Sequence, residues 1–257
     1  MIRTIIAVLK LIIFLCFTPP MMLLQWLIVK FKLGNTTWVP QFYNQTLCRI
    51  IGIKITVEGN PLKNGLIVSN HVSWKDILIL NALTPLSLIA KREVGAWPLF
   101  GSLARLQGTV FVNRESKRSI ITSLGEIQTR LLQGDVLVLF PEATTHTGKS
   151  IIPFKSSFVA AAERTGTEVV PVTIIYQSQH GLPLTLRQRP QVAWYGDGDL
   201  APHLWAIFKS GPIGVKVIFH TPLRPANFLN RKVLTKYAER QIQTSLAHHL
   251  HADPKMG

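Results

Sequence analysis

Short apolar runs that alternate with longer helical segments constrain the fold of this chain most strongly. Strand-like runs lie near residues 53–57, 66–68, 87–90, 109–112, 136–140 and 169–175. Helical patterns lie between or beside them, over residues 41–51, from Ser73 onward, and over residues 117–133 and 158–164. Strands joined by helices form right-handed crossovers in a parallel sheet. We therefore expect an α/β fold with a mostly parallel central sheet flanked by helices.

The pattern changes after residue 175. A polar, proline-rich stretch over residues 177–190 precedes a predicted strand near Val192–Tyr195. A further strand over 214–219 leads to a closing helix over residues 232–251. Nothing in this part reads as an interdomain linker, so residues 41–257 are predicted to form one domain.

The first 40 residues have a different character. No formal charge occurs from Leu11 to Val29, and basic residues lie on both sides of this stretch. Pro19 and Pro20 interrupt the stretch near its middle, where proline kinks or breaks a helix. We predict two short membrane-anchoring helices within residues 1–40, lying in or along one leaflet. A single bilayer crossing stays open as an alternative, whereas bulky residues where a cleavage site would stand disfavour a signal peptide.

The charge balance points to an anionic partner. Lysine and arginine number 28 and aspartate and glutamate 13, which gives a formal net charge of +15. Nucleic acid and an anionic bilayer surface both fit such a charge. The apolar N-terminus favours membrane lipids, and no nucleic-acid-binding motif is recognisable, so we expect no nucleic-acid partner. Histidines and the two cysteines lack the spacing of a metal site, so none is expected.

A histidine and an aspartate five positions apart follow the apolar run 66–68. These are His71 and Asp76, in the segment Ser69-Asn70-His71-Val72-Ser73-Trp74-Lys75-Asp76. Within one helix they would point about 140° apart. If the helix begins near Ser73, His71 lies in the preceding loop and can fold back onto Asp76. Such a pair can withdraw a proton from a hydroxyl. A loop histidine beside an ordinary helix-start carboxylate is the structural alternative.

Four segments in order resemble the glycerolipid acyltransferases, the family that contains the bacterial enzyme PlsC. Asn70 to Asp76 matches the family's NHxxxxD box, and Gly108 to Arg114 resembles its second box. Phe140 to Thr145 resembles the third, FPEGT, and Val169 to Val172 the fourth. The resemblance covers about 150 residues and implies acyl transfer from acyl-CoA or acyl-carrier protein to the free hydroxyl of a lysolipid. No cofactor is expected.

The resemblance also implies roles for individual residues. His71 would accept the hydroxyl proton and Asp76 would orient His71. Arg114 would contact the acceptor head group, and Glu142 would hold Arg114 or the acceptor. Lys91 matches a lysine often found between the first two boxes, although a surface lysine explains it as well. The family implies a location at the cytoplasmic face of the inner (plasma) membrane.

Two positions depart from the family pattern. Ala143 replaces the glycine of the third box, so we expect an ordinary backbone conformation there, or a site in which a small side chain suffices. Thr145 stands where many lysophosphatidate enzymes carry arginine, and relatives resembling lyso-ornithine-lipid acyltransferases share this threonine. The expected acceptor is 1-acyl-sn-glycerol-3-phosphate, with lyso-ornithine lipid or another lysolipid as the alternative. A non-catalytic membrane-binding protein of the same fold is a remote third reading.

Overall fold

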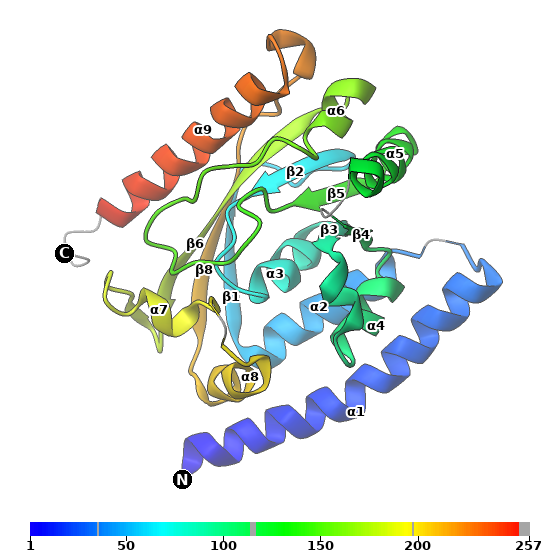
Figure 1. Cartoon of the computed structure of the whole chain (residues 1–257). Helices are drawn as coiled ribbons and strands as arrows, with labels where there is room; N and C mark the ends of the chain where they lie inside the picture. The colour runs from blue at the N-terminus through cyan, green and yellow to red at the C-terminus, as the bar shows by residue number, and fades with distance from the viewer. Residues whose placement is uncertain (35, 114–116, 197, 252–257) are drawn as a thin grey trace.

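A central sheet lies between two groups of helices in the computed structural model, which describes residues 1–34, 36–113, 117–196 and 198–251 (Figure 1). Its strands are β1 (Ile53–Glu58), β2 (Gly65–Ser69), β3 (Ser87–Lys91), β4 (Val110–Val112), β5 (Val136–Leu139), β6 (Val169–Gln179), β7 (Leu182–Pro183) and β8 (Ile213–Phe219). They are ordered β1-β8-β6-β2-β5-β3-β4, with β7 paired to β6. Only β6 pairs antiparallel, with β8 and β7, among the described strands. The predicted mostly parallel sheet is confirmed.

The helices cover both faces of this sheet. They are α1 (Ile2–Phe31), α2 (Trp38–Ile51), α3 (Lys75–Leu83), α4 (Phe100–Leu106), α5 (Lys117–Leu132), α6 (Ala160–Thr165), α7 (Arg189–Val192), α8 (Leu200–Lys209) and α9 (Arg231–His251), with 3-10 turns η1 (Arg92–Ala96) and η2 (Pro225–Asn227). Figure 1 shows α5, α6 and α9 on one side and α1, α2, α3 and α8 on the other.

The central strand β2 divides its side chains between these two layers. Ile67 belongs to the core that α2, α3 and α8 share, whereas Leu66 and Val68 belong to the core beneath α5, α6 and α9. All three side chains are almost fully buried. Successive residues of a strand point to opposite faces, so a strand covered on both sides reads as a continuous apolar run.

The N-terminal prediction of two short helices is wrong. α1 is one continuous helix with Pro19 and Pro20 inside it, and Figure 1 shows it curving along the domain. It packs against α2, α4 and α8, and this packing holds the helix together where the prolines remove backbone hydrogen bonds. Just before the prolines, the Thr18 hydroxyl donates to the Phe14 carbonyl at 2.7 Å.

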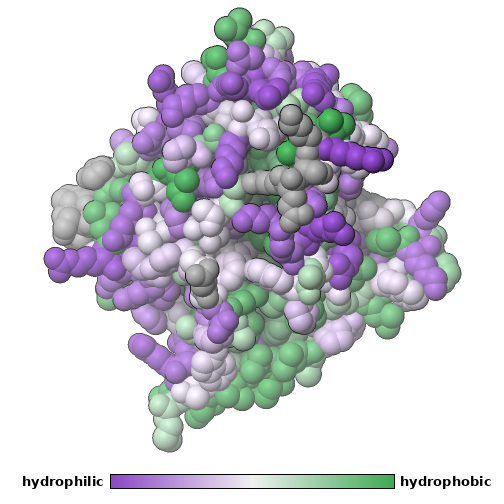
Figure 2. Space-filling model, in the orientation of Figure 1, coloured by the Kyte–Doolittle hydropathy of each residue, from purple (hydrophilic) through white to green (hydrophobic). Residues whose placement is uncertain are grey.

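By length and composition, α1 qualifies as a bilayer-crossing helix among the described residues. Its large apolar side chains are mostly exposed, and Figure 2 shows apolar surface gathered along the edge of the molecule where α1 runs. Exposed apolar patches of this size mark interaction surfaces. The exposed apolar face of α1 is therefore a candidate membrane-contact surface.

The strand predicted near Val192–Tyr195 is also wrong. Residues Arg189–Val192 form the short helix α7, and an irregular segment follows. Pro190 occupies the first turn of α7, where its fixed φ favours a helix. The backbone of this segment bonds to a loop and not to a strand: the Trp194 backbone N–H donates to the Val72 carbonyl, in the loop after β2, at 3.0 Å. Helices α4 and α8 were not predicted.

Candidate active site

The carboxyl end of β2 leads directly into the loop that carries His71. The neighbouring strands β5 and β6 run parallel to β2, so their carboxyl ends lie at the same edge of the sheet. Asn70 fixes the first turn of the loop, because its side chain accepts from the Ile174 N–H at 2.8 Å and donates to the Ile174 carbonyl at 2.9 Å. Open α/β sheets place their ligands at this edge.

His71 and Asp76 are in contact, as the sequence predicted. His71 Nδ1 lies 2.9 Å from Asp76 Oδ2. A carboxylate can only accept, so Nδ1 carries the proton and Nε2 is free to accept one. The contact forms because α3 begins at Lys75, which leaves His71 in the preceding loop. His71 retains 17% side-chain exposure while Asp76 has none.

The Asp76 carboxylate is fully occupied by hydrogen bonds. Its Oδ2 also accepts from the backbone N–H groups of Val72 at 2.7 Å and Ser73 at 2.9 Å. Its Oδ1 accepts from the Tyr176 hydroxyl on β6 at 2.7 Å. These bonds fix the carboxylate behind His71, where it can stabilise positive charge that develops on the imidazole.

The segment after β5 supports the other side of His71. The Phe140 ring stacks on the imidazole with 3.9 Å between the ring centroids. Glu142, nearly fully buried, accepts from the His71 backbone N–H and from the Ile152 N–H, both at 2.9 Å. His146 Nε2 lies 2.8 Å from the same carboxylate. Both Glu142 oxygens are thus used within the protein, and its predicted contact with Arg114 or the acceptor stays a prediction.

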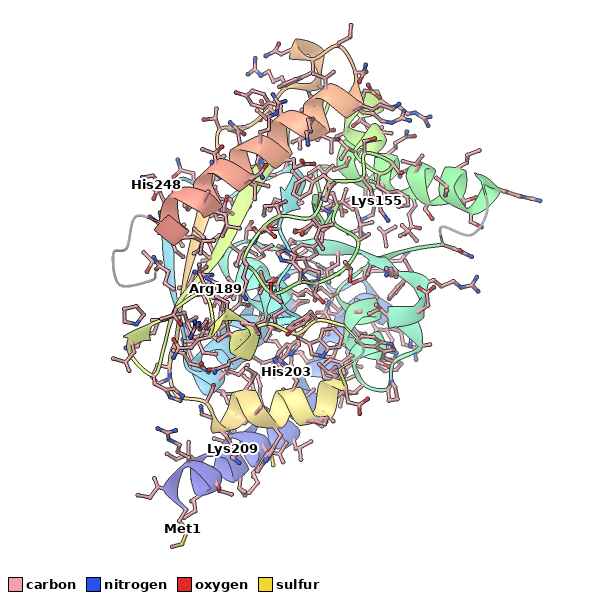
Figure 3. The ribbon with its side chains drawn as sticks, turned by 60° about the vertical axis from the view of Figure 1, so that its left-hand side comes forward. Met1, Lys155, Arg189, His203, Lys209 and His248 are labelled. Atoms are coloured by element: carbon pink, nitrogen blue, oxygen red, sulfur yellow. The ribbon has the colours of Figure 1, made fainter. Side chains whose placement is uncertain are left out.

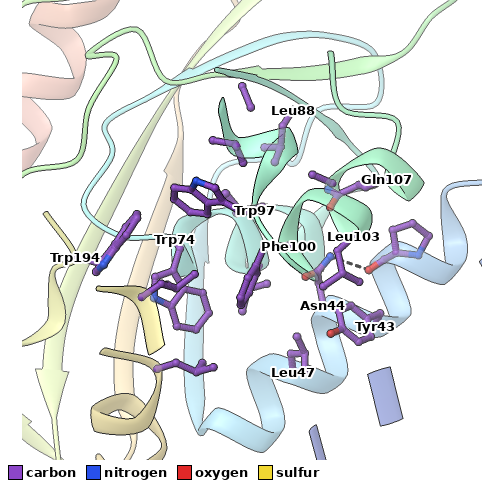
Figure 4. Close-up of a pocket in the computed structure, with 18 of the residues that line it drawn as sticks. Tyr43, Asn44, Leu47, Trp74, Leu88, Trp97, Phe100, Leu103, Gln107 and Trp194 are labelled. Atoms are coloured by element: carbon purple, nitrogen blue, oxygen red, sulfur yellow. Dashed lines mark hydrogen bonds between the residues drawn. The ribbon is translucent and has the colours of Figure 1, made fainter. Parts of the chain in front are cut away.

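A cavity of about 390 Å³ opens beside His71. Its lining comes from α1, α2, α3, α4, α8 and the loops that follow β3 and β5, and it is largely apolar. Figure 4 shows Trp74, Trp97 and Trp194 near one end of the close-up and Tyr43, Leu47 and Leu103 toward the other. The rings of Trp97 and Trp194 are perpendicular, with centroids 5.8 Å apart. The arrangement suits a long apolar chain whose reactive end lies at His71.

The remaining predicted site residues have different positions. Lys91, at the end of β3, and Thr145 both line the cavity, and Lys91 is largely exposed. Arg114 lies outside the described residues. Ala143 has φ 63°, so the expectation of an ordinary backbone there is wrong, and the alternative, that a small side chain suffices, stays a prediction. Because Ala143 also lines the cavity, a larger side chain would intrude into it.

Two contributors were not predicted. Tyr176 lies 100 positions from Asp76, and its only sequence signal is a hydroxyl-bearing ring at the end of an apolar run. Lys75 is fully buried beside Asp76, and burial lowers its pKa to about 7 despite the nearby carboxylate. On α8, His203 accepts from the Trp74 indole N–H at 2.9 Å, and Figure 3 shows its position above that helix. Burial lowers the His203 pKa to about 4, and repulsion between the imidazolium and a charged Lys75 lowers it further in the same direction.

Comparison with known proteins gives this geometry a context. The model of the acyltransferase family matches residues 54–175, which include His71, Asp76 and Glu142. Tyr176 lies one residue beyond this match. A lyso-ornithine lipid O-acyltransferase of Brucella abortus is 39% identical over 234 residues, covering 86% of this chain and 86% of that protein. One of Rhizobium meliloti is 36% identical, covering 90% of this chain and 81% of that protein.

A second activity occurs among the relatives. A 1-acyl-sn-glycerol-3-phosphate acyltransferase of Neisseria gonorrhoeae is 32% identical, covering 77% of this chain and 75% of that protein. The crystal structure of the 1-acyl-sn-glycerophosphate acyltransferase PlsC from Thermotoga maritima superposes with a TM-score of 0.69 at 20% identity, over 96% of this chain and 94% of that one, which establishes the shared fold. The chain belongs to the PlsC-like acyltransferase family and is an acyltransferase.

Proposed function

We propose that this enzyme acylates the hydroxyl of a lyso-ornithine lipid, with acyl-CoA or acyl-carrier protein as the donor. Lysolipid acylation is common to the relatives, so the proposal concerns the acceptor, the donor and the residues that act. The observation that carries it is the low density of positive charge around the cavity. Lys91 is the one lysine or arginine among the described lining residues.

The acceptor hydroxyl is the nucleophile in the proposed reaction. His71 Nε2 removes its proton as the oxygen attacks the thioester carbonyl, and Asp76 stabilises the imidazolium that forms. Collapse of the tetrahedral intermediate breaks the carbon–sulfur bond, and His71 returns the proton to the thiolate. An ester and a free thiol result, and no metal, cofactor or protein nucleophile takes part.

The acceptor head group distinguishes the two candidate substrates. A phosphomonoester carries up to two negative charges and is usually bound by several charged donors, with arginine favoured for its planar fork. Here Thr145 replaces the arginine of the third box, and a hydroxyl suits a zwitterionic head group better. The names of the Brucella abortus and Rhizobium meliloti relatives support the same acceptor.

1-Acyl-sn-glycerol-3-phosphate is the second candidate acceptor. The Neisseria gonorrhoeae relative supports it, as does the predicted contact between Arg114 and a phosphate. The proposed location is the cytoplasmic face of the inner membrane, where acyl thioesters and a lysolipid embedded in the bilayer both reach the cavity.

A panel of lysolipids tests the proposed function. Purified enzyme is given an acyl thioester with lyso-ornithine lipid, 1-acyl-sn-glycerol-3-phosphate or lysophosphatidylglycerol, and each product is quantified. We expect the highest kcat/KM with lyso-ornithine lipid, and a loss of roughly 100- to 10,000-fold in His71→Ala. Exclusive use of 1-acyl-sn-glycerol-3-phosphate or of lysophosphatidylglycerol would reject the proposed acceptor. Near-wild-type turnover by His71→Ala would reject the proposed mechanism.

A further inference from the structure

Lys75 occupies an unusual position for a lysine. Its side chain has no exposed surface, and it lies one residue before Asp76. In the described part of the chain, Nζ donates to two neutral oxygens, Ser73 Oγ at 2.9 Å and the Val192 carbonyl at 2.7 Å. None of the ion pairs found there includes Lys75. Buried lysines without a carboxylate partner are costly and are often functional.

The two acceptors match an uncharged amine. A neutral lysine has two N–H donors and one lone pair, whereas the ammonium has three donors to satisfy. The surroundings do not all favour the neutral form, because Asp76 and the faces of Tyr176 and Trp74, with ring centroids 5.3 and 5.6 Å from Nζ, attract a cation. Burial outweighs them, which brings the Lys75 pKa to about 7.

A chain of hydrogen bonds connects Lys75 to His71. Lys75 donates to Ser73 Oγ, the Ser73 side chain lies beside the Tyr176 hydroxyl, and the Ser73 backbone N–H donates to Asp76 Oδ2 at 2.9 Å. Tyr176 donates to Asp76 Oδ1, and Asp76 Oδ2 receives the His71 Nδ1–H. Ser73 accepts from Lys75 and donates to Asp76, and Asp76 accepts from Ser73, Tyr176 and His71. The orientation of Asp76 behind His71 therefore depends on groups that Lys75 holds in place.

Lys75 also fixes a wall of the cavity. The Val192 carbonyl that it binds lies two residues before Trp194, whose ring lines the cavity near His71. The Trp194 N–H donates in turn to the Val72 carbonyl. The segment after α7 is thus attached to the catalytic loop on both sides of Ala193.

We propose that Lys75, as a neutral amine, is a positioning residue for acyl transfer, ordering the chain behind His71 and holding the Trp194 segment against the catalytic loop. Protonation of Lys75 opposes the reaction in two ways. It adds a donor for which the described residues provide no third hydrogen-bond acceptor. It also places a positive charge near the imidazolium that His71 must form. This inference rests on acyl transfer by His71, not on the identity of the acceptor.

The charged and titratable groups around Lys75 are few. Asp76 lies on the same helix, Tyr176 on β6, His203 on α8 and His71 in the preceding loop. His203 is mostly neutral above pH 5 because burial lowers its pKa to about 4, and burial raises the Tyr176 pKa well above its ordinary value. Of the groups in this cluster whose pKa is shifted, Lys75 is therefore the one that changes charge near pH 7.

The first experiment measures the kinetics of Lys75→Met, a substitution that keeps the length of the side chain and removes its polar head. With whichever lysolipid the wild-type enzyme acylates, we expect kcat to fall roughly 10- to 100-fold above pH 8, with little change in the KM of the acyl donor. Lys63→Met, at an exposed turn, is the matched control and should retain wild-type kinetics.

The pH profile separates a positioning role from a purely structural one. If Lys75 and His71 must both be unprotonated, log(kcat/KM) of the wild-type enzyme falls at low pH with a limiting slope of two protons, and Lys75→Met restores a one-proton slope. A wild-type kcat in Lys75→Met would overturn the proposal, as would an unchanged slope. If that variant does not fold, Lys75→Gln replaces it, because an amide provides two N–H donors without charge, and we expect a one-proton slope there too.

A double-mutant cycle tests the chain itself. Tyr176→Phe removes the hydroxyl between Ser73 and Asp76 and preserves the ring. If Lys75 acts through Tyr176, the double variant loses less kcat than the product of the two single losses. Multiplicative losses would overturn the connection through Tyr176. Acceptor preference does not enter either readout, so the acceptor proposal and the Lys75 proposal fail on different results.

Discussion

At the scale of single residues, the burial of Lys75 makes folding stability depend on pH. Its pKa is about 7 in the folded protein against 10.5 in an ordinary environment. Between these values the unfolded chain binds one more proton than the folded chain, so stability rises with pH across this window. We expect Lys75→Met to be more stable than wild type at pH 7, with the advantage shrinking as pH approaches 10.5.

Thermal unfolding in detergent micelles over this pH range measures the effect. The exposed Lys63→Met variant provides the reference, because its lysine is solvated in both states. A constant difference between Lys75→Met and wild type across the window would contradict the expected pH dependence. An enzyme that keeps a residue with this cost gains something from it other than stability.

Ala143 is a second residue with an identifiable cost. Its φ of 63° lies in the left-handed region, which disfavours a side chain by about 1–2 kcal/mol. Replacing Ala143 with glycine removes this cost but makes the unfolded chain more flexible, which offsets part of the benefit. Ala143→Gly should therefore stabilise the protein by about 0.5–1 kcal/mol. The midpoint of thermal unfolding checks this. Ala201→Gly, on the exposed first turn of α8, should instead destabilise, and a lower midpoint for Ala143→Gly would contradict the argument.

Residue-scale prediction from the sequence succeeded where the geometry is local. His71 and Asp76 lie five positions apart, and the start of one helix decides whether they meet. Tyr176 reaches Asp76 from 100 positions away, because β6 pairs with β2. No spacing in the sequence encodes that pairing. Lys75 escaped prediction for the same reason, because its partner Val192 lies 117 positions away.

At the scale of elements, α1 is part of the catalytic domain as well as an apolar surface. It supplies Phe14, Met21 and Gln25 to the cavity lining. Near its prolines, the Thr18 hydroxyl lies 2.9 Å from the Tyr43 hydroxyl of α2, and both groups are buried. Because Thr18 donates to the Phe14 carbonyl, the Tyr43 hydroxyl donates to Thr18. This contact fixes α1 to α2 at the point where proline weakens the helix.

We expect Thr18→Val to lower stability by about 1–2 kcal/mol, because it preserves the side-chain shape and leaves the Tyr43 hydroxyl without this acceptor. Thr4→Val, on the exposed part of α1, is the matched control and should change stability by less than about 0.5 kcal/mol. Thermal unfolding of both variants in the same micelles provides the comparison. Equal effects of the two substitutions would show that α1 is not fixed to α2 through Thr18.

Element prediction followed the strength of the pattern. Buried parallel strands read as apolar runs, and those with helices between them were found close to their observed limits. α4, α7 and α8 were missed because proline, glycine and tryptophan in or beside them hide the helical period. α1 was predicted as two helices because two adjacent prolines are a strong local signal for a helix break. The packing that preserves the helix involves α2, α4 and α8, and the local sequence does not reveal those contacts.

At the scale of the whole molecule, apolar surface and basic charge act together at the membrane. Lys30 and Lys32 lie exposed at the end of α1, next to the exposed apolar residues Val29 and Phe31. Anionic lipid attracts each lysine near its surface by about 1 kcal/mol, and salt screens that attraction. The apolar contribution of α1 is insensitive to salt by comparison. Membrane binding should therefore have an electrostatic component that high salt removes and an apolar component that remains at high salt.

Removing the charge at the end of α1 tests this division. We expect Lys30→Gln/Lys32→Gln to weaken binding to vesicles that contain anionic lipid by roughly 30-fold at low salt, which corresponds to about 2 kcal/mol, and to leave binding to zwitterionic vesicles unchanged. Lys232→Gln/Arg240→Gln removes the same charge from α9, which covers the other face of the sheet, and should have little effect. Vesicle flotation at low and high salt measures both variants. Equal losses of vesicle binding in the two variants would mean that net charge, and not the orientation set by α1, governs attachment. A loss confined to the α1 variant would place the cavity that α1 lines against the bilayer, where the lysolipid is held.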